Sequence, residues 1–119
     1  MDLKLFREYC LSQKGASEDF PFDETTLVFR VGSKIFALTD TENIPYSFNL
    51  KCEPERAVEL REIHSCIIPG WHMNKKHWNT VEPDGSLSLG LIKGLIDHSY
   101  ELVFKSLKKS EKEDILENK

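Results

Sequence analysis

The amino-acid sequence predicts an α+β fold, a two-layer sandwich in which an antiparallel sheet packs against helices. Three observations support this class: strand-like segments follow one another through tight turns, residues 46–52 alternate strictly between apolar and polar side chains, and a long apolar stripe of helical period begins near Leu89. Consecutive strands joined by short turns pair antiparallel, and helices at intervals along the chain cover such a sheet. The 119 residues are expected to form one domain, 1–119, with a core that needs neither disulfides nor a structural metal.

The first half of the chain is expected to form one helix and three strands. Asp2 can cap a helix in which apolar residues recur at helical spacing, and Gly15 ends it. The segment TTLVFRVGSKIFALTD predicts two strands joined by the two-residue turn Gly32-Ser33. In YSFNLKC, residues 46–52, the alternation predicts a third strand with one buried face.

The second half is expected to form a helix, one or two strands and a final helix. Pro54 suits a first helical turn, so PERAVELREIH predicts a helix that stops before Pro69-Gly70. Residues 77–81, HWNTV, have the composition of a strand, and GWHMNK is expected to be a loop or short strand that leads into it.

The final helix is predicted from about Leu89 by its apolar stripe. Gly90 and Gly94 lie inside this helix, where their missing side chains are expected to permit close packing. The polar tail, residues 109–119, is expected to fray. The stripe consists of Ile92, Leu95, Ile96, Ser99, Val103 and Leu107.

Composition and charge disfavour several classes of protein. The net charge of −4 argues against a nucleic-acid-binding surface that covers the whole molecule. The three cysteines are an odd number without CxxC spacing, which indicates reduced, buried thiols. No apolar run reaches the length of a membrane span, and charged residues interrupt the amino terminus, unlike a signal peptide. We therefore expect a soluble cytoplasmic monomer without membrane attachment.

The segment GWHMNKKHWNTV, residues 70–81, concentrates amphipathic and hydrogen-bonding side chains. It lies in a window from Ile63 to Val81 that contains two lysines and three histidines but no Asp or Glu, so the local charge can be positive in an acidic protein. Lysines can contact phosphates, asparagines can bond to bases or sugars, and Trp or His can stack on bases. The predicted nucleic-acid contacts are Lys51, Trp71, His72, Asn74, Lys75, Lys76, His77 and Asn79.

A structural interpretation of the same segment stays open beside the binding one. We expect Trp78 and Met73 to fill the core beneath the terminal helix, because large aromatic side chains in a small domain are mostly buried. In this interpretation Asn74 and Asn79 satisfy the backbone of a turn. The lysine pair, residues 75–76, then only solvates a loop.

The residues give little support to an enzyme or a metalloprotein. Cys66 lies two residues from His64, but neighbours at this spacing diverge on a helix, and no acid lies near to orient the histidine. A metal site built from His72 and His77 with His64 or Cys66 has no recognised ligand spacing. The sequence also has no glycine-rich phosphate loop. We therefore expect no catalytic residue, no metal and no cofactor.

The segment also resembles a known family. PGWHMNKKHWNTV, followed by Asp84-Gly85, is similar to the signature of the MmcQ/YjbR family, and FPFDE, KIFAL, LKCEPE and LIDHSYELV match that family in the same order. Trp71 is a departure, because tyrosine is commoner there. The resemblance implies a two-layer fold similar to CyaY-like or secretion-chaperone-like domains. It carries the family's DNA-binding label to Lys51, Asn74, Lys75, Lys76, His77 and Trp78.

Together these observations predict a small, non-enzymatic, cytoplasmic binding protein, which the resemblance makes bacterial. The first hypothesis is DNA binding through the acid-free segment 70–81. The alternative hypothesis is a protein–protein interaction or chaperone-like module that uses the face of its sheet or its terminal helix.

Overall fold

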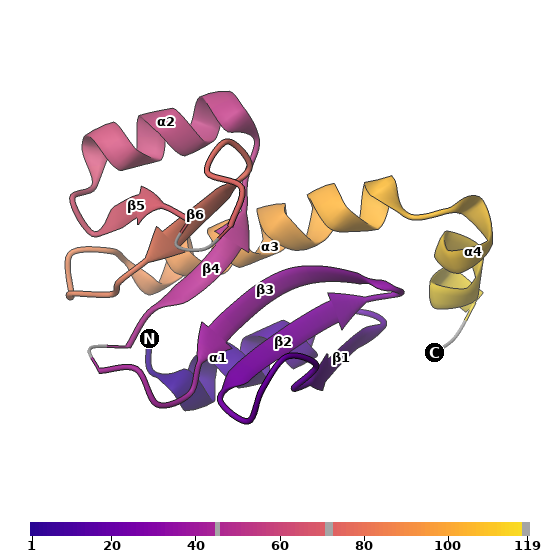
Figure 1. Cartoon of the computed structure of the whole chain (residues 1–119). Helices are drawn as coiled ribbons and strands as arrows, with labels where there is room; N and C mark the ends of the chain where they lie inside the picture. The colour runs from indigo at the N-terminus through magenta and orange to yellow at the C-terminus, as the bar shows by residue number, and fades with distance from the viewer. Residues whose placement is uncertain (45, 71–72, 118–119) are drawn as a thin grey trace.

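One antiparallel sheet organises the chain in the computed structural model, which describes residues 1–44, 46–70 and 73–117 (Figure 1). Within these residues the strand order is β1-β2-β3-β4-β6-β5, and every neighbouring pair is antiparallel. The predicted α+β class is confirmed. The elements in chain order are α1 (Leu3–Leu11), β1 (Ala16–Asp19), β2 (Thr26–Val31), β3 (Lys34–Asp40), β4 (Phe48–Lys51), α2 (Pro54–Ile63), β5 (Ile67–Pro69), β6 (Trp78–Val81), α3 (Leu89–Ser106) and α4 (Lys109–Glu117).

Local signals in the sequence fix several of these boundaries. The carboxylate of Asp2 accepts a hydrogen bond from the N–H of Leu5 at 2.8 Å and caps α1. In the same way, the hydroxyl of Ser88 accepts the N–H of Leu91 at 3.1 Å and caps α3. Gly32 has φ +59°, which the two-residue turn between β2 and β3 requires.

Helices α1, α2 and α3 pack their apolar sides against one face of the sheet and form the core with it. Figure 1 shows α1 and α3 behind the sheet, and the opposite face is turned towards the viewer. Phe6 of α1 stacks on Phe48 of β4 with ring centroids 4.4 Å apart, and Ile96 of α3 is fully buried. The two predicted layers are therefore a helical layer and a sheet with one face free of described helices.

Ser99, on the buried side of α3, links this helix to two strands. Its hydroxyl donates to the carbonyl of Phe36 in β3 at 2.5 Å and accepts the N–H of Lys51 in β4 at 2.9 Å. Since Ser99 is 0% exposed, both bonds satisfy groups that water does not reach. The helix therefore fixes the backbone at Lys51, where β4 ends.

The polar tail was expected to fray, but its residues 109–117 form the helix α4. Ile115 is 9% exposed and packs against Gly15, where an added Cβ would come within 2.9 Å of the Ile115 side chain. The carboxylate of Glu111 also accepts the N–H of Ser33 at 3.0 Å. The Nζ of Lys14 donates to the carbonyl of Leu116 at 3.1 Å as well. One buried side chain and two hydrogen bonds therefore hold a segment whose composition alone indicates disorder.

Two strands and two glycines also differ from expectation. The mostly polar strand β1 adds a fourth strand before α2, and the three-residue β5 lies at the other edge of the sheet. Edge strands bury little apolar surface, so they carry little hydrophobic pattern. Gly90 and Gly94 have open space where a Cβ would stand, so their close packing was a wrong prediction.

Candidate functional site

Gly70 and Trp78 close the base of the loop between β5 and β6. The N–H of Gly70 donates to the carbonyl of Trp78 at 2.8 Å, so the two ends of the loop meet. A Cβ on Gly70 would lie 2.8 Å from the Cβ of Trp78 and 3.1 Å from that of Met73. Only glycine therefore lets the two ends approach this closely.

Asn74 builds the turn inside this loop. Its side-chain oxygen accepts the N–H of Lys76 at 2.9 Å, and its carbonyl accepts the N–H groups of His77 at 3.2 Å and Trp78 at 2.9 Å. These bonds are typical of an asparagine that initiates a turn. Asn74 therefore has the structural role that the alternative interpretation expected, although its side chain is exposed.

Arg61 of α2 forms hydrogen bonds to the end of this loop. The sequence did not indicate a role for Arg61 in the site. Its Nε donates to the side-chain oxygen of Asn79 at 2.6 Å, and its terminal nitrogen donates to the carbonyl of Lys75 and, at 3.5 Å, to that of Trp78. All these acceptors are neutral, and none of the ion pairs among the described residues involves Arg61. The guanidinium charge therefore adds to that of the lysines in the loop.

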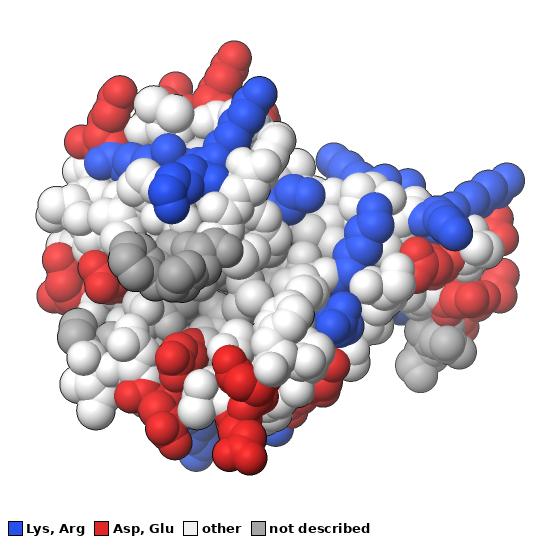
Figure 2. Space-filling model, in the orientation of Figure 1, with Lys and Arg blue, Asp and Glu red and all other residues white. Residues whose placement is uncertain are grey.

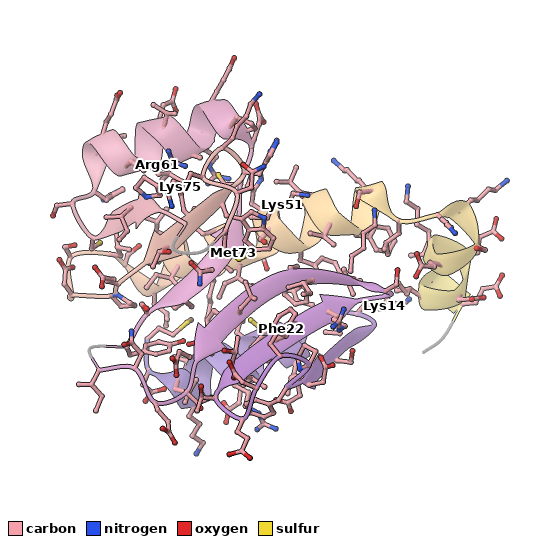
Figure 3. All side chains as sticks on the ribbon, in the orientation of Figure 1. Lys14, Phe22, Lys51, Arg61, Met73 and Lys75 are labelled. Atoms are coloured by element: carbon pink, nitrogen blue, oxygen red, sulfur yellow. The ribbon has the colours of Figure 1, made fainter. Side chains whose placement is uncertain are left out.

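Four cations form what we call the basic strip: Lys51, Arg61, Lys75 and Lys76. Lys51 lies opposite Trp78 in the pairing of β4 with β6, which brings β4 beside the end of the loop. Lys76 is exposed, whereas the Nζ of Lys75 donates to the carbonyl of Gly70 at 3.2 Å. Figure 3 shows Arg61, Lys75 and Lys51 on one side of Met73, and Phe22 on the other.

Trp78 and Met73 do not fill the core beneath the terminal helix, contrary to prediction. Val81 and Asn79 of β6 face the helical layer, so the alternation of a strand turns Trp78 to the opposite face. Trp78 is half-buried there, and the half-buried Met73 lines a cavity together with Leu38. Both side chains therefore belong to the face of the sheet that no described helix covers.

Asn79, a predicted nucleic-acid contact, is 3% exposed. Its amide oxygen accepts from Arg61, and its amide nitrogen donates to the carbonyl of Ala57 at 3.5 Å. The side chain faces α2 and cannot reach a ligand on the surface, so its predicted contact with nucleic acid was wrong. Two further predicted contacts, Trp71 and His72, lie outside the described residues.

The open face of the sheet carries a row of side chains that runs across five strands. Their order, from β2 to β5, is Val28, Leu38, Asn49, Thr80 and Ile68, and each residue pairs with the next. The hydroxyl of Thr80 donates to the side-chain oxygen of Asn49. The row therefore changes from apolar at β2 and β3 to polar at β4 and β6.

Two adjoining cavities of about 490 and 510 Å³ lie over this row, and we call them together the open-face hollow. Both are lined by Asp40 and Asn49, so they lie side by side. Phe22 and Met73 line the end over β2 and β3, and Glu82 lines the end over β5 and β6.

Charge is divided across this face of the molecule. In Figure 2, Lys and Arg side chains gather directly above the centre of this face and Asp and Glu side chains gather below it, with further Asp and Glu side chains at the upper edge of the molecule. The described residues that line the hollow include the carboxylates of Asp40 and Glu82 but no Lys, Arg or His. A polyanion can therefore approach the basic strip, whereas the hollow favours cationic or neutral groups.

Other candidate chemistries find few partners in the described part of the chain. The sulfur of Cys66 lies 3.7 Å from the hydroxyl of Ser86, and Cys66 is buried. Burial also raises the pKa of the Cys10 and Cys52 thiols. No group of three or more His, Cys, Asp or Glu side chains within 1–44, 46–70 and 73–117 is placed to hold a metal ion. None of the described helices is long and apolar enough to cross a membrane.

Comparisons with known proteins identify relatives over most of the chain. The YjbR family model matches residues 11–102. The chain is 37% identical to the uncharacterised protein YjbR of Escherichia coli K12 over 102 residues, which cover 85% of this chain and 86% of that one. It is also 37% identical to the uncharacterised protein YbdF of Escherichia coli O157:H7 over 97 residues, 81% of this chain and 79% of the relative.

Solved structures give the same result. Protein DR2400 of Deinococcus radiodurans superposes with a TM-score of 0.89 at 41% identity, over 95% of this chain and 86% of that one. A protein from Pseudomonas syringae superposes with a TM-score of 0.74 at 31% identity, over 87% of this chain and 99% of that one. The chain therefore belongs to the YjbR family.

Proposed function

We propose that this protein binds single-stranded nucleic acid along the basic strip, as a non-enzymatic cytoplasmic monomer. The observation that carries the proposal is the arrangement of the strip around the hydrogen-bonded turn at residues 74–78. Arg61 fixes the carbonyls of Lys75 and Trp78, and the turn at Asn74 leaves Lys76 exposed. A loop held in this way presents its cations without a large loss of conformational entropy on binding.

A single strand fits this surface better than a duplex does. The half-buried Trp78 and His77 lie beside the lysines and offer rings on which unpaired bases can stack. A duplex hides its bases and is wider, so on the strip it would also overlie the carboxylates of Asp40 and Glu82 in the hollow. Those carboxylates repel phosphates.

The test is fluorescence anisotropy with a fluorescein-labelled 12-mer of mixed sequence, single-stranded or in duplex, at several salt concentrations. Three lysine–phosphate contacts predict a slope of log K against log salt of about −2 for the single strand, at about −0.7 per contact. The variant Lys51→Gln with Lys76→Gln should reduce this slope by about 1.4. Sequence preference should hardly change, because phosphate contacts position the strand without specifying bases.

The matched control removes two lysines from the helical layer. Lys4 of α1 and Lys105 of α3 are exposed, so Lys4→Gln with Lys105→Gln changes the net charge equally and should keep the parent slope. Thermal melts should show all proteins equally folded, since surface substitutions change stability by about 0.5 kcal/mol or less. Equal binding by both double variants, or no binding of the single strand at low salt, rejects the proposal.

A further inference from the structure

We propose that the open-face hollow binds an extended segment of a partner protein that carries a Lys or Arg side chain among apolar residues. This proposal concerns a different surface from the basic strip and does not depend on nucleic-acid binding. It follows from the shape of the hollow, its two kinds of lining and the charge of its carboxylates.

The shape of the hollow suits a chain segment. It crosses β2, β3, β4, β6 and β5, and neighbouring strands lie about 4.8 Å apart, so it is about 19 Å long. An extended peptide advances about 3.3 Å per residue, so about six residues span it. Such a segment lies across the strands and does not pair with an edge.

The end over β2 and β3 can take apolar side chains. Phe22 is 66% exposed, which is unusual for a phenylalanine in a small domain. It lines the hollow together with Ile35, Leu38 and Met73. A flexible methionine beside an aromatic ring adapts to side chains of different shapes, so this end recognises an apolar residue of the partner.

The end over β5 and β6 can take a cation and a peptide backbone. Asp40 lies where the two cavities meet, and Glu82 lies at the far end. Between them the side chains of Ser47 and Asn49 carry polar groups that can bond to a backbone that has no strand to pair with. No described lining residue is a cation, so the charge of the site complements a Lys or Arg of the partner.

The test begins with the full-length protein and a display library of random heptapeptides. Selected peptides should be enriched in Lys or Arg together with apolar residues. The strongest is then synthesised with a fluorescein label, and its affinity is measured by anisotropy. Asp40→Asn with Glu82→Gln should weaken binding at least about tenfold, the effect of losing about 1.4 kcal/mol.

Three further variants make this test specific. Glu8→Gln with Glu101→Gln removes two exposed carboxylates from α1 and α3, on the helical side, and should leave the affinity within about twofold of the parent. Phe22→Ala should weaken binding about tenfold without loss of folding, because Phe22 is mostly exposed. Lys51→Gln with Lys76→Gln should not weaken it, which separates this site from the basic strip.

Five results would overturn the inference. Three of them are the absence of any selected peptide, enrichment of Asp and Glu among selected peptides, and equal affinity of the parent and the Asp40–Glu82 variant. The fourth is displacement of the peptide by spermidine at equal concentration, which assigns the hollow to a small amine. The fifth is concentration-dependent self-association that the peptide abolishes, which assigns the hollow to a second copy of the chain.

Discussion

Replacing Arg61 tests whether this side chain organises the loop between β5 and β6. Arg61→Met keeps an unbranched stem of similar length but removes the guanidinium and its bonds to Asn79, Lys75 and Trp78. We expect the free energy of unfolding to fall, because each of these bonds contributes to the stability of the folded state.

The bond to Asn79 contributes most. Asn79 is 3% exposed, so its amide oxygen loses its charged donor where water has little access, and an unsatisfied buried group costs about 1 to 3 kcal/mol. The bond to the carbonyl of Lys75 lies at an exposed residue, where water replaces much of it, and the contact with Trp78 is long at 3.5 Å. The total expected loss is about 2 to 3 kcal/mol.

Urea unfolding followed by far-ultraviolet circular dichroism measures this loss. The midpoint should fall with an unchanged m-value, because the folded surface stays the same. Trypsin should also cleave after Lys75 or Lys76 faster than in the parent, because the loop opens more often. Asn79→Ala and the double variant complete a mutant cycle whose coupling energy should be about 1 kcal/mol or more.

If Arg61→Met lowers the free energy of unfolding by less than about 0.5 kcal/mol, the range of an ordinary surface substitution, Arg61 does not organise the loop. Simple additivity of the effects of Arg61→Met and Asn79→Ala would equally show that the two side chains are not coupled. Arg61→Lys is the informative control, since it keeps the charge but cannot bond to Asn79 and Lys75 as a planar fork. It should therefore recover only part of the lost stability.

Three further predictions concern the rest of the fold. Ile115→Ala should lower the free energy of unfolding by about 2 kcal/mol, because Ile115 docks α4 against Gly15; no change in a urea titration would mean that the tail frays. Tyr46→Phe should leave stability unchanged or raise it by about 1 kcal/mol, since the buried Tyr46 hydroxyl has no partner among the described residues; a clear loss in the same titration would show a missing bond. Burial lowers the pKa of His98, whose neutral Nε2 accepts the N–H of Glu53, so the unfolded state takes up the proton first. The free energy of unfolding should therefore fall as the pH drops below about 6.5 and level off once the pH lies below the pKa of His98 in the folded state. His98→Gln, measured beside the parent protein over the same pH range, should lack this fall.

Where a residue acts on its neighbours in the chain, the sequence was a reliable guide. The caps at Asp2 and Ser88 and the turn at Gly32 depend on residues within three positions of each other, so local patterns predict them. The alternation in YSFNLKC likewise predicted β4, although the observed strand is shorter. The family resemblance was carried by the continuous segment 69–81 and is confirmed by the YjbR model match.

The candidate site could not be predicted from local patterns, because its main contacts join distant parts of the chain. Arg61 looks like one of many charged residues on a helix, and nothing in its neighbours indicates that it bonds to Asn79, 18 positions away. Asn79 looked like a surface group because asparagines near turns usually are. Only the packing of α2 over β6 buries it.

The sequence by itself determined the antiparallel α+β architecture, the loop rich in cations and the family, because periodicity, capping and a contiguous motif are local properties of the chain. The tertiary structure decided which face each side chain occupies. Trp78 was assigned to the core by its size, yet the pairing of β6 with β4 turned it to the open face beside Lys51. The hollow and the docking of α4 likewise depend on residues that meet only when distant segments pack together, and no local pattern encodes such a meeting.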